Sequence, residues 1–412
     1  MDCFRTTCLV NPIWRVVSRA LLAAAILWWS EVSPAAAEER APRIVFQAAL
    51  PLPNRADDAD GNSVEITGLS GVAWLGADRY VAVMDNSQYL LLFRLLLTQT
   101  GKPLAVDSFR IVTLSQQHDY EDLVPCPAAV VRGIRRDRGV RPDDNGPERE
   151  ECVLVCEEDT PAVRAFSLAD GKMLGAIPLP GNLLTRRGNR GLESLAIEPD
   201  GRFLWTANEE ALPADGPPAA VGSGTVVRLT RLPLPAEDSR PRADTAAAPV
   251  AFQAAYRVDP PHSFVRVFAG QPLSGLSALV ALGNGRLLAL ERSGAPGLPP
   301  FASRIYLVDA GAAVDVSAVE RDLAAREEAA ARKRLLWTDS LGINLEGLCL
   351  GPRLADGNRC LVAIADNGGI GTPNQLVGLS LATPAPAVKP AVLGVVAAVV
   401  AIALLVGRLT SP

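Results

Sequence analysis

Gly191-Leu192-Glu193-Ser194-Leu195 opens a segment that recurs, with variations, five times along this chain of 412 residues. The other copies open at Gly68-Leu69-Ser70-Gly71-Val72, Asp119-Tyr120-Glu121-Asp122-Leu123, Gly275-Leu276-Ser277-Ala278-Leu279 and Asn344-Leu345-Glu346-Gly347-Leu348. Each copy continues through a turn into an apolar run that ends in a carboxylate: Asp85, Glu157, Glu209, Glu291 or Asp366. Two of the turns, Asp200-Gly201-Arg202 and Asn284-Gly285-Arg286, contain the Asp-Gly or Asn-Gly pair typical of two-residue hairpins. Each copy therefore predicts a strand, a tight turn and an antiparallel strand.

The geometry of a hairpin gathers these acids on one edge of the sheet, because its first and last residues lie at the same end. Five hairpins repeated around an axis predict an all-β fold, a β-propeller. We expect a sixth blade, from Thr225–Phe268 or from the chain ends, while five or seven blades stay open as alternatives. The outer strands of the blades are expected in the remaining β-rich runs, which are Leu90–Leu97, Ala162–Ser167, Thr225–Leu232, Ala251–Val258 and Arg304–Val308.

Insertions separate the repeats unevenly. Arg132–Glu151 is charged and contains Gly and Pro, which favours a loop, and Pro233–Pro249 is rich in Pro and Ala. Ser317–Leu336 is rich in Ala, Glu and Arg and contains no Gly or Pro. This composition predicts an amphipathic helix inserted at the rim of the propeller.

The N-terminal segment, residues 1–37, has the pattern of a secretory signal peptide. Arginines precede the apolar run Ala20–Trp29, and Ala35-Ala36-Ala37 offers small residues for cleavage. An uncleaved N-terminal anchor is the alternative. We expect the folded body of the protein, the β-propeller, to occupy residues 44–382.

The C-terminal segment Pro390–Gly407 carries no charge and follows a Pro/Ala-rich linker, residues 383–389. As a helix it would be about 27 Å long, close to the roughly 30 Å of a bilayer's hydrocarbon core. The segment predicts a single transmembrane helix, followed by a short cytoplasmic tail at residues 408–412. With the signal, it predicts a membrane protein whose body is extracytoplasmic, in the periplasm or at the cell surface. A hydrophobic helix packed on the body is the alternative.

Charge and motif content exclude several function classes. The formal net charge is −5 and only 5% of the residues are aromatic, so the chain has no basic footprint for nucleic acid. It has two histidines, no Gly-x-Ser-x-Gly elbow in a strand-turn-helix setting, no P-loop and no Cys/His spacing for zinc.

The cysteines allow two disulfides in an oxidising compartment. Once residues 1–37 are removed, five cysteines remain, and Cys126 and Cys152 flank the charged insertion. We expect these two to pair, and Cys349 to pair with Cys360, which leaves Cys156 free. Buried reduced thiols are the alternative.

The repeats also resemble a known family. Asn189-Arg190-Gly191-Leu192-Glu193-Ser194-Leu195-Ala196, with Ala207-Asn208-Glu209, is similar to the core motif of the phytase-like family, described as having esterase-like activity of phytase. Gly285–Arg292 and Asn344–Leu348 with Ala365-Asp366-Asn367 are similar to its later segments, so that the resemblance spans Gly68 to Leu381. It implies a propeller and, by analogy with calcium-dependent phytases of similar fold, hydrolysis of phosphate esters.

The gathered acids predict a metal site. Oxygen ligands, many of them charged, suit a hard cation, and Ca²⁺ fits better than Zn²⁺. The candidate ligands are Glu121, Glu193, Glu346, Asp85, Glu157, Glu209, Glu291 and Asp366, and the first three are also the catalytic candidates. Arg190 and Arg292 are candidate contacts for the phosphate of a small-molecule substrate.

We therefore expect a membrane-anchored, calcium-dependent phosphoric ester hydrolase, acting on monoesters or diesters. The alternative is a non-catalytic propeller that serves as a binding or scaffold protein. Its acids would then hold a structural metal or cap strand ends through backbone N–H groups.

Overall fold

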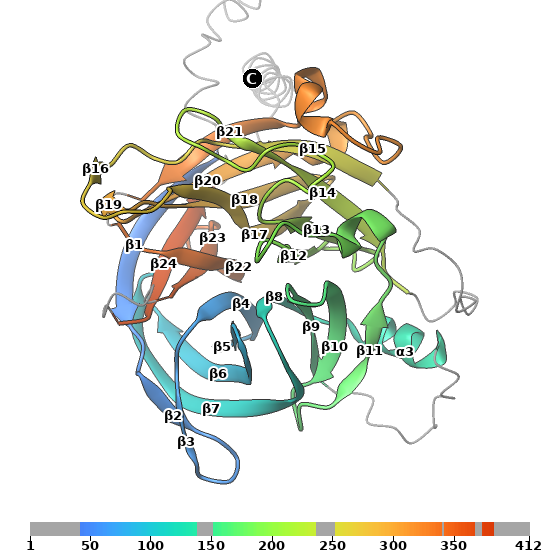
Figure 1. Ribbon diagram of the computed structural model, residues 1–412. Coiled ribbons are helices and arrows are strands. Elements are labelled where there is room, and N and C mark those ends of the chain that lie inside the picture. Colours follow the sequence, from blue (N-terminus) through green and yellow to red (C-terminus); the bar gives the residue numbers. More distant parts are fainter. Residues whose placement is uncertain (1–41, 138–150, 236–251, 340–341, 367–372, 383–412) are drawn as a thin grey trace, which may run out of the picture. The chain divides into compact units, whose positions relative to one another are not determined.

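Five four-stranded antiparallel sheets surround a common axis in the computed structural model of this chain (Figure 1). The structure describes residues 42–137, 151–235, 252–339, 342–366 and 373–382. Arg43–Ala382 forms one compact unit, the β-propeller. The innermost strands of neighbouring blades contact one another around the axis, and each overlaps one copy of the repeat.

The first three blades follow the chain in simple order from the axis outward. Blade 1 contains β4 (Leu69–Gly76), β5 (Arg79–Met84), β6 (Ser87–Leu97) and β7 (Pro103–His118). Blade 2 contains β8 (Tyr120–Pro125), β9 (Cys152–Glu157), β10 (Ala162–Ser167) and β11 (Met173–Ile177). Blade 3 contains β12 (Leu192–Ile197), β13 (Phe203–Asn208), β14 (Thr225–Pro233) and β15 (Phe252–Val258).

The last two blades are completed by segments that are distant in sequence. Blade 4 contains β17 (Leu273–Gly283), β18 (Arg286–Gly294), β20 (Phe301–Asp309) and β21 (Arg332–Thr338). Blade 5 contains β22 (Leu345–Arg353), β23 (Arg359–Ala365) and β24 (Gln375–Ala382), and its outermost strand is the N-terminal β1 (Arg43–Pro51). The pairing of β1 with β24 joins the two ends of the propeller within one sheet.

Two small sheets and short helices lie outside the blades. The small sheets are β2 (Arg55–Asp57) with β3 (Ser63–Glu65), and β16 (Val265–Arg266) with β19 (Gly297–Leu298). One α-helix, α3 (Ala128–Asp137), and the 3₁₀ turns η1 (Gly181–Leu184), η2 (Ala310–Ala312), η3 (Leu323–Ala325) and η4 (Glu327–Ala329) complete the described elements.

The core lies between the blades, because both faces of each sheet are covered. Tyr80 and Phe93 of blade 1 pack with Val362 and Leu376 of blade 5, and Trp205 of blade 3 packs in a cluster with residues of blade 4. A strand that is buried on both faces reads as a continuous apolar run instead of an alternating one. This explains the uninterrupted apolar stretches that follow each repeat motif.

The expectation of six blades was wrong, since the described residues form five. Thr225–Leu232 and Ala251–Val258, which were candidates for an extra blade, are the outer two strands of blade 3. The chain ends supply a strand to blade 5 and form no blade of their own.

The expected helix over Ser317–Leu336 was also wrong. Its last five residues, Arg332–Leu336, belong to β21, which pairs with β20, and its first half is held by blade 3. The buried Arg228 donates hydrogen bonds to the carbonyl oxygens of Val316 and Val319, at 3.2 and 2.7 Å, and Ala324 N donates to Asp215 O at 2.8 Å. Tertiary hydrogen bonds thus outweigh local helix propensity. The helix α3 instead overlaps the insertion for which a loop was predicted.

The predicted disulfides are absent, because Cys126, Cys152, Cys156, Cys349 and Cys360 are all free thiols. Cys126 N donates to Cys152 O at 2.8 Å, so these two cysteines are neighbours. Cys349 lies opposite Val362 in the β22–β23 register, so it does not face Cys360.

The predicted signal peptide, linker, transmembrane segment and tail all lie outside the described residues. Among the residues that are described, no helix has both the length and the apolar character needed to cross a membrane.

Candidate functional site

Two positions in each blade place side chains around the axis at one face of the propeller. One position lies on or just after the second strand. It directly follows the residue that pairs with the second residue of each repeat copy. These pairs are Leu69 with Met84, Tyr120 with Glu157, Leu192 with Asn208, Leu276 with Glu291 and Leu345 with Ala365. The equivalent second-strand residues are therefore Asp85, Glu158, Glu209, Arg292 and Asp366.

The inner-strand position lies at an irregularity that all five blades share. The pairing register skips Glu193 in β12, Ser277 in β17 and Glu346 in β22, and it skips two residues at the same point of β4 and β8. A β-bulge of this kind bends the strand and re-aims a side chain. The equivalent inner-strand residues are Ser70, Glu121, Glu193, Ser277 and Glu346.

The glycine that opens the repeat in blades 1, 3 and 4 makes room for these carboxylates. A Cβ atom on Gly68, which has a φ of +59°, would lie 1.6 Å from Asp85 Oδ1. A Cβ atom on Gly275 would lie 2.4 Å from Cγ of Glu209, which belongs to the neighbouring blade. A side chain at either position would displace an acid, so the Gly of the repeat is part of the site.

The two sets of positions enclose a small cavity on the axis, which we call the ring cavity. Its volume is about 220 Å³. Eight of the ten equivalent residues line it, all except Ser277 and Asp366, and Asn189, Arg190 and Leu273 complete the lining. Six lining side chains are carboxylic acids and two are arginines, so the cavity has an excess of acid groups.

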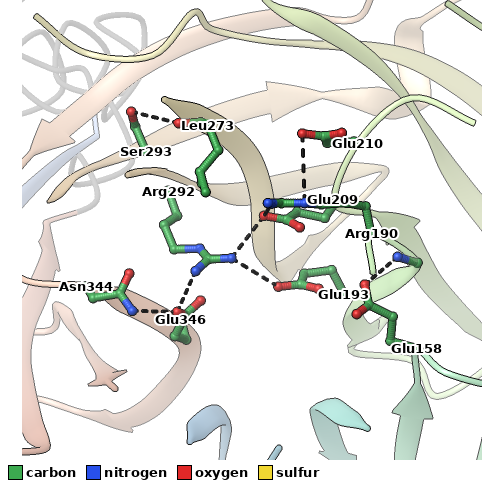
Figure 2. Close-up of polar contacts among 11 residues, drawn as sticks. Glu158, Arg190, Glu193, Glu209, Glu210, Leu273, Arg292, Ser293, Asn344 and Glu346 are labelled. Carbon is green, nitrogen blue, oxygen red and sulfur yellow. Dashed lines mark hydrogen bonds and ion pairs between the residues drawn. The ribbon is translucent and has the colours of Figure 1, made fainter. Parts of the chain in front are cut away.

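Arg292 occupies the position that an acid holds in the other four blades, and it bridges the ring (Figure 2). Its Nη1 donates to Glu346 Oε1 at 2.7 Å, and its Nη2 donates to Glu209 Oε1 at 2.9 Å and lies 3.9 Å from Glu193 Oε1. Burial disfavours the charged guanidinium, but Glu346 and Glu209 more than offset this and raise the pKa of Arg292. Arg292 is thus the main internal counter-charge of the ring cavity.

Arg190, in the loop before β12, also contacts Glu209. Its Nη1 donates to Glu209 Oε1 at 2.6 Å, and its Nε lies 4.0 Å from Glu210 Oε1. Glu209 Oε1 therefore accepts from both arginines (Figure 2).

Burial shifts the acids of the ring cavity toward their neutral forms. It is the first cause that raises the pKa of Asp85 to about 6 and of Glu158 and Glu346 to about 7. Burial and the surrounding carboxylates also raise the pKa values of Glu121 and Glu193 well above the usual range. Carboxylates this close need a proton or a cation between them.

Two groups of acids at the cavity have the spacing of metal ligands. Glu158, Glu193 and Glu209 bring one oxygen atom each within 4.8 Å of one another, and Asp119, Glu121 and Glu158 do the same. Glu158 belongs to both groups. Its Oε1 also accepts a hydrogen bond from Gly191 N, which fixes its position between them.

The structure brings together most of the predicted site residues and leaves three outside. Asp85, Glu121, Glu193, Glu209, Glu346, Arg190 and Arg292 line the ring cavity. Asp366 lies at its edge, where it accepts a hydrogen bond from Gly68 N at 3.1 Å. Glu157 instead pairs with Arg164, close to His118 and Asp159, and Glu291 binds Lys333 at 2.6 Å and the Tyr256 hydroxyl at 2.6 Å.

Glu158 is the main site residue that sequence analysis missed. In blades 2 and 4 an acid stands one position before the equivalent residue, so the aligned acids Glu157 and Glu291 are one residue out of register. Successive side chains of a strand point to opposite faces, so a shift by one residue moves the acid away from the axis. The Glu157-Glu158 pair was the available signal, but only the strand pairing distinguishes its two members.

The comparisons with known proteins identify the family. A family model described as "Phytase-like: Esterase-like activity of phytase" matches residues 64–369. The chain belongs to this family. The resemblance noted in the repeat motifs is thereby confirmed, while no curated protein matches the chain significantly.

Several solved structures resemble this phytase-like protein weakly. An endo-arabinase from Bacteroides thetaiotaomicron has 10% identity and a TM-score of 0.39, over 84% of this chain and 99% of the other. A PQQ-bound aldose sugar dehydrogenase from Streptomyces coelicolor has 11% identity and a TM-score of 0.34, over 83% and 99%. The periplasmic gluconolactonase of Pseudomonas aeruginosa has 11% identity and a TM-score of 0.32, over 84% and 98%. These similarities say nothing about the activity of this chain.

The raised pKa values predict that the metal-free protein loses stability as pH rises. A carboxyl group with a higher pKa in the folded chain binds its proton more tightly there than in the unfolded chain, where the pKa of Glu is about 4.3. The free energy of unfolding is therefore greatest below about pH 4.3, the pKa of Glu in the unfolded chain. It falls as pH rises through about 6 and 7, the pKa values of Asp85, Glu158 and Glu346 in the folded chain. Thermal unfolding of the full chain with a chelator, at pH 5 and pH 8, checks this. Glu158→Gln should reduce the fall, and a melting temperature that rises between these pH values would contradict it.

Proposed function

We propose that this phytase-like protein hydrolyses phosphate esters with Ca²⁺ held at the ring cavity. The observation that carries the proposal is the meeting of Glu158, Glu193 and Glu209 oxygen atoms within 4.8 Å, beside two arginines. Acid oxygens favour a divalent cation, and arginines favour a phosphate. Few kinds of site need acid oxygens and arginines together. The active site of a metal-assisted phosphate ester hydrolase is one that does.

The donor atoms of the cavity fit Ca²⁺. They are carboxylate oxygens, and Ca²⁺ accepts six to eight oxygen ligands in flexible geometry. Glu158, Glu193 and Glu209 would hold one ion, and Asp119 and Glu121 with Glu158 offer a second position. A bound ion supplies charge neutralisation for the ester and lowers the pKa of a bound water.

The arginines and Glu346 have roles that follow from their contacts. Arg292 and Arg190 both donate to Glu209 Oε1. A phosphate group in the cavity would carry more negative charge than this one oxygen atom, so the two arginines would bind the phosphate. Glu346 is bonded to Arg292 and has a pKa of about 7, which suits a group that gives and takes a proton near neutral pH. Glu193 and Glu121, with pKa values raised further, are the other candidates for this transfer.

A non-catalytic propeller is the second candidate function, and one observation favours it. Arg292 already satisfies Glu209 and Glu346 with hydrogen bonds of 2.9 and 2.7 Å. The ring therefore has an internal counter-charge that needs no ligand. In that case the acids and Arg292 stabilise the meeting of five blades, and any metal is structural.

The proposal includes a place in the cell. The uncharged segment Pro390–Gly407 and the signal-like residues 1–37 support an extracytoplasmic body anchored in a membrane by one helix. We expect the full chain to remain in the membrane pellet after a high-salt wash and a variant without residues 390–407 to be released. Equal partition of both proteins would contradict the anchor.

Calcium is expected to stabilise the folded protein through Glu158. An ion that binds only the folded state adds about 2.7 kcal/mol at a hundredfold excess over its Kd, so the melting temperature should rise by several degrees. Glu158→Gln should lose most of this rise, and Mg²⁺ should give less of it than Ca²⁺.

Glu157→Gln is the matched control, because the two residues are adjacent but only Glu158 lines the ring cavity. The control variant should keep the Ca²⁺-dependent rise, even where the loss of its pairing with Arg164 lowers the starting value. Equal responses of the two variants would show that the ion binds elsewhere.

Turnover is expected on at least one class of phosphate ester. The full chain is assayed with p-nitrophenyl phosphate, its bis-ester and phytate, with Ca²⁺ and with a chelator. Glu346→Gln should lower kcat by about 10²- to 10⁴-fold, the usual contribution of proton transfer. Arg292→Lys should weaken turnover strongly, because Lys cannot bridge two acids, whereas Arg202→Lys, in an exposed turn paired with Asp200, should not. No metal-dependent turnover on any substrate would leave the non-catalytic propeller.

A further inference from the structure

A second cavity, of about 640 Å³, lies over blade 1 next to the ring cavity. Its walls come from the segment around β3 and from the turn between β5 and β6. Asn62, Thr67, Asn86 and Tyr89 are lining residues with amide or hydroxyl groups, and Asp58, Glu65 and Asp85 are lining residues with carboxyl groups. Asn62 Nδ2 donates to Asp58 Oδ2 at 3.0 Å within the lining. We call this cavity the blade 1 cleft.

The blade 1 cleft and the ring cavity meet at Asp85, which lines both. After β3 the chain crosses the blade from the rim to β4 near the axis (Figure 1). The cleft follows this segment, so it leads from the rim to the ring. A ligand whose reacting group lies in the ring cavity can therefore extend along the blade 1 cleft.

The two cavities differ in size, and this difference indicates which part of a ligand each can hold. The ring cavity, at about 220 Å³, is smaller than the roughly 300–1,000 Å³ of ordinary small-molecule sites, whereas the blade 1 cleft is within that range. The ring cavity is thus suited to a phosphoryl group with its metal, and the rest of the molecule needs another space.

The lining of the cleft selects against anions. It includes three carboxylic acids and no lysine or arginine. Arg55 is outside the lining, and its guanidinium donates to Ser63 Oγ at 2.9 Å and to Ser63 O at 2.8 Å. A ligand with several phosphates would meet like charge here.

The lining also favours hydroxyl groups over a cation. A cation needs acceptors only, whereas Asn and the hydroxyls of Thr and Tyr both donate and accept hydrogen bonds. Each hydroxyl of a sugar or polyol likewise donates and accepts. The mixture of carboxyl, amide and hydroxyl groups in the cleft matches such a ligand.

We propose that the blade 1 cleft binds the alcohol half of the substrate and that this half is an uncharged sugar or polyol, not a polyphosphorylated ring. The inference rests on the proposed function, because it assigns the ester's phosphate to the ring cavity. The protein would then prefer the phosphate ester of a neutral polyol to phytate.

Equilibrium binding tests the proposal by isothermal titration calorimetry with Ca²⁺ present. The full chain carries Glu346→Gln so that ligands are not consumed, and the probes are inorganic phosphate, glucose 1-phosphate, phytate, phosphocholine and glucose. Glucose 1-phosphate should bind at least about tenfold more tightly than inorganic phosphate. Phytate and phosphocholine should not show this gain over inorganic phosphate. Adding Thr67→Val and Tyr89→Phe should weaken the binding of glucose 1-phosphate about tenfold. Each uncharged hydrogen bond contributes roughly a factor of three to five to the affinity.

Thr338→Val, at an exposed threonine of β21 in blade 4 and outside the cleft, is the matched control and should change nothing. Tighter binding of phytate or phosphocholine than of glucose 1-phosphate would overturn the proposal, as would an unchanged affinity in the Thr67/Tyr89 variant. A failure of inorganic phosphate to bind would count against the proposed function instead. The cleft would then be tested by glucose alone: weaker binding in the Thr67/Tyr89 variant would support it, and no such loss would overturn it.

Discussion

Repulsion among carboxylates at the axis is the constraint on which the site depends. Two like charges 4.8 Å apart, the limit of spacing within the Glu158, Glu193 and Glu209 group, repel by about 3.5 kcal/mol at an effective dielectric constant of about 20. That is more than most single contacts contribute, so the ring cannot be fully ionised and empty of cations. Arg292 and Arg190 neutralise part of the negative charge of the ring. Protons neutralise another part, as the raised pKa values of the acids indicate.

The fold produces this concentration of charge by repetition. Every blade has an inner strand with a bulge at the same place, and one residue on or just after its second strand lies next to the start of the repeat. Any acid at these two positions therefore meets its counterparts from the other blades. The replacement of one acid by Arg292 lets a single side chain contact acids of blades 3 and 5 from blade 4. The repetition that brings the acids together therefore also places the arginine that neutralises them.

The site has two parts with different chemistry. The ring cavity is small and contains both signs of charge, which suits a metal and a phosphoryl group. The blade 1 cleft is larger and contains acids with neutral polar groups and no cation. Asp85 belongs to both and has a pKa of about 6, raised by burial and by Asp119 and Asp366. Its charge therefore responds both to the state of the ring and to what occupies the cleft.

The sequence by itself determined the repeat, the all-β class, the family and the gathering of most acids on one face. These follow from local signals, namely hairpin turns, apolar runs and the spacing of one motif, which survive in any arrangement of the blades. The structure decided what depends on distant pairing. The β1–β24 pairing fixed the number of blades at five, and contacts with Arg228 and β20 converted a helix-like sequence into turns and a strand. Strand register selected Glu158 over Glu157 and placed Arg292, not Glu291, at the axis, because neighbouring residues on a strand face opposite ways and only the partner strand shows which one faces inward.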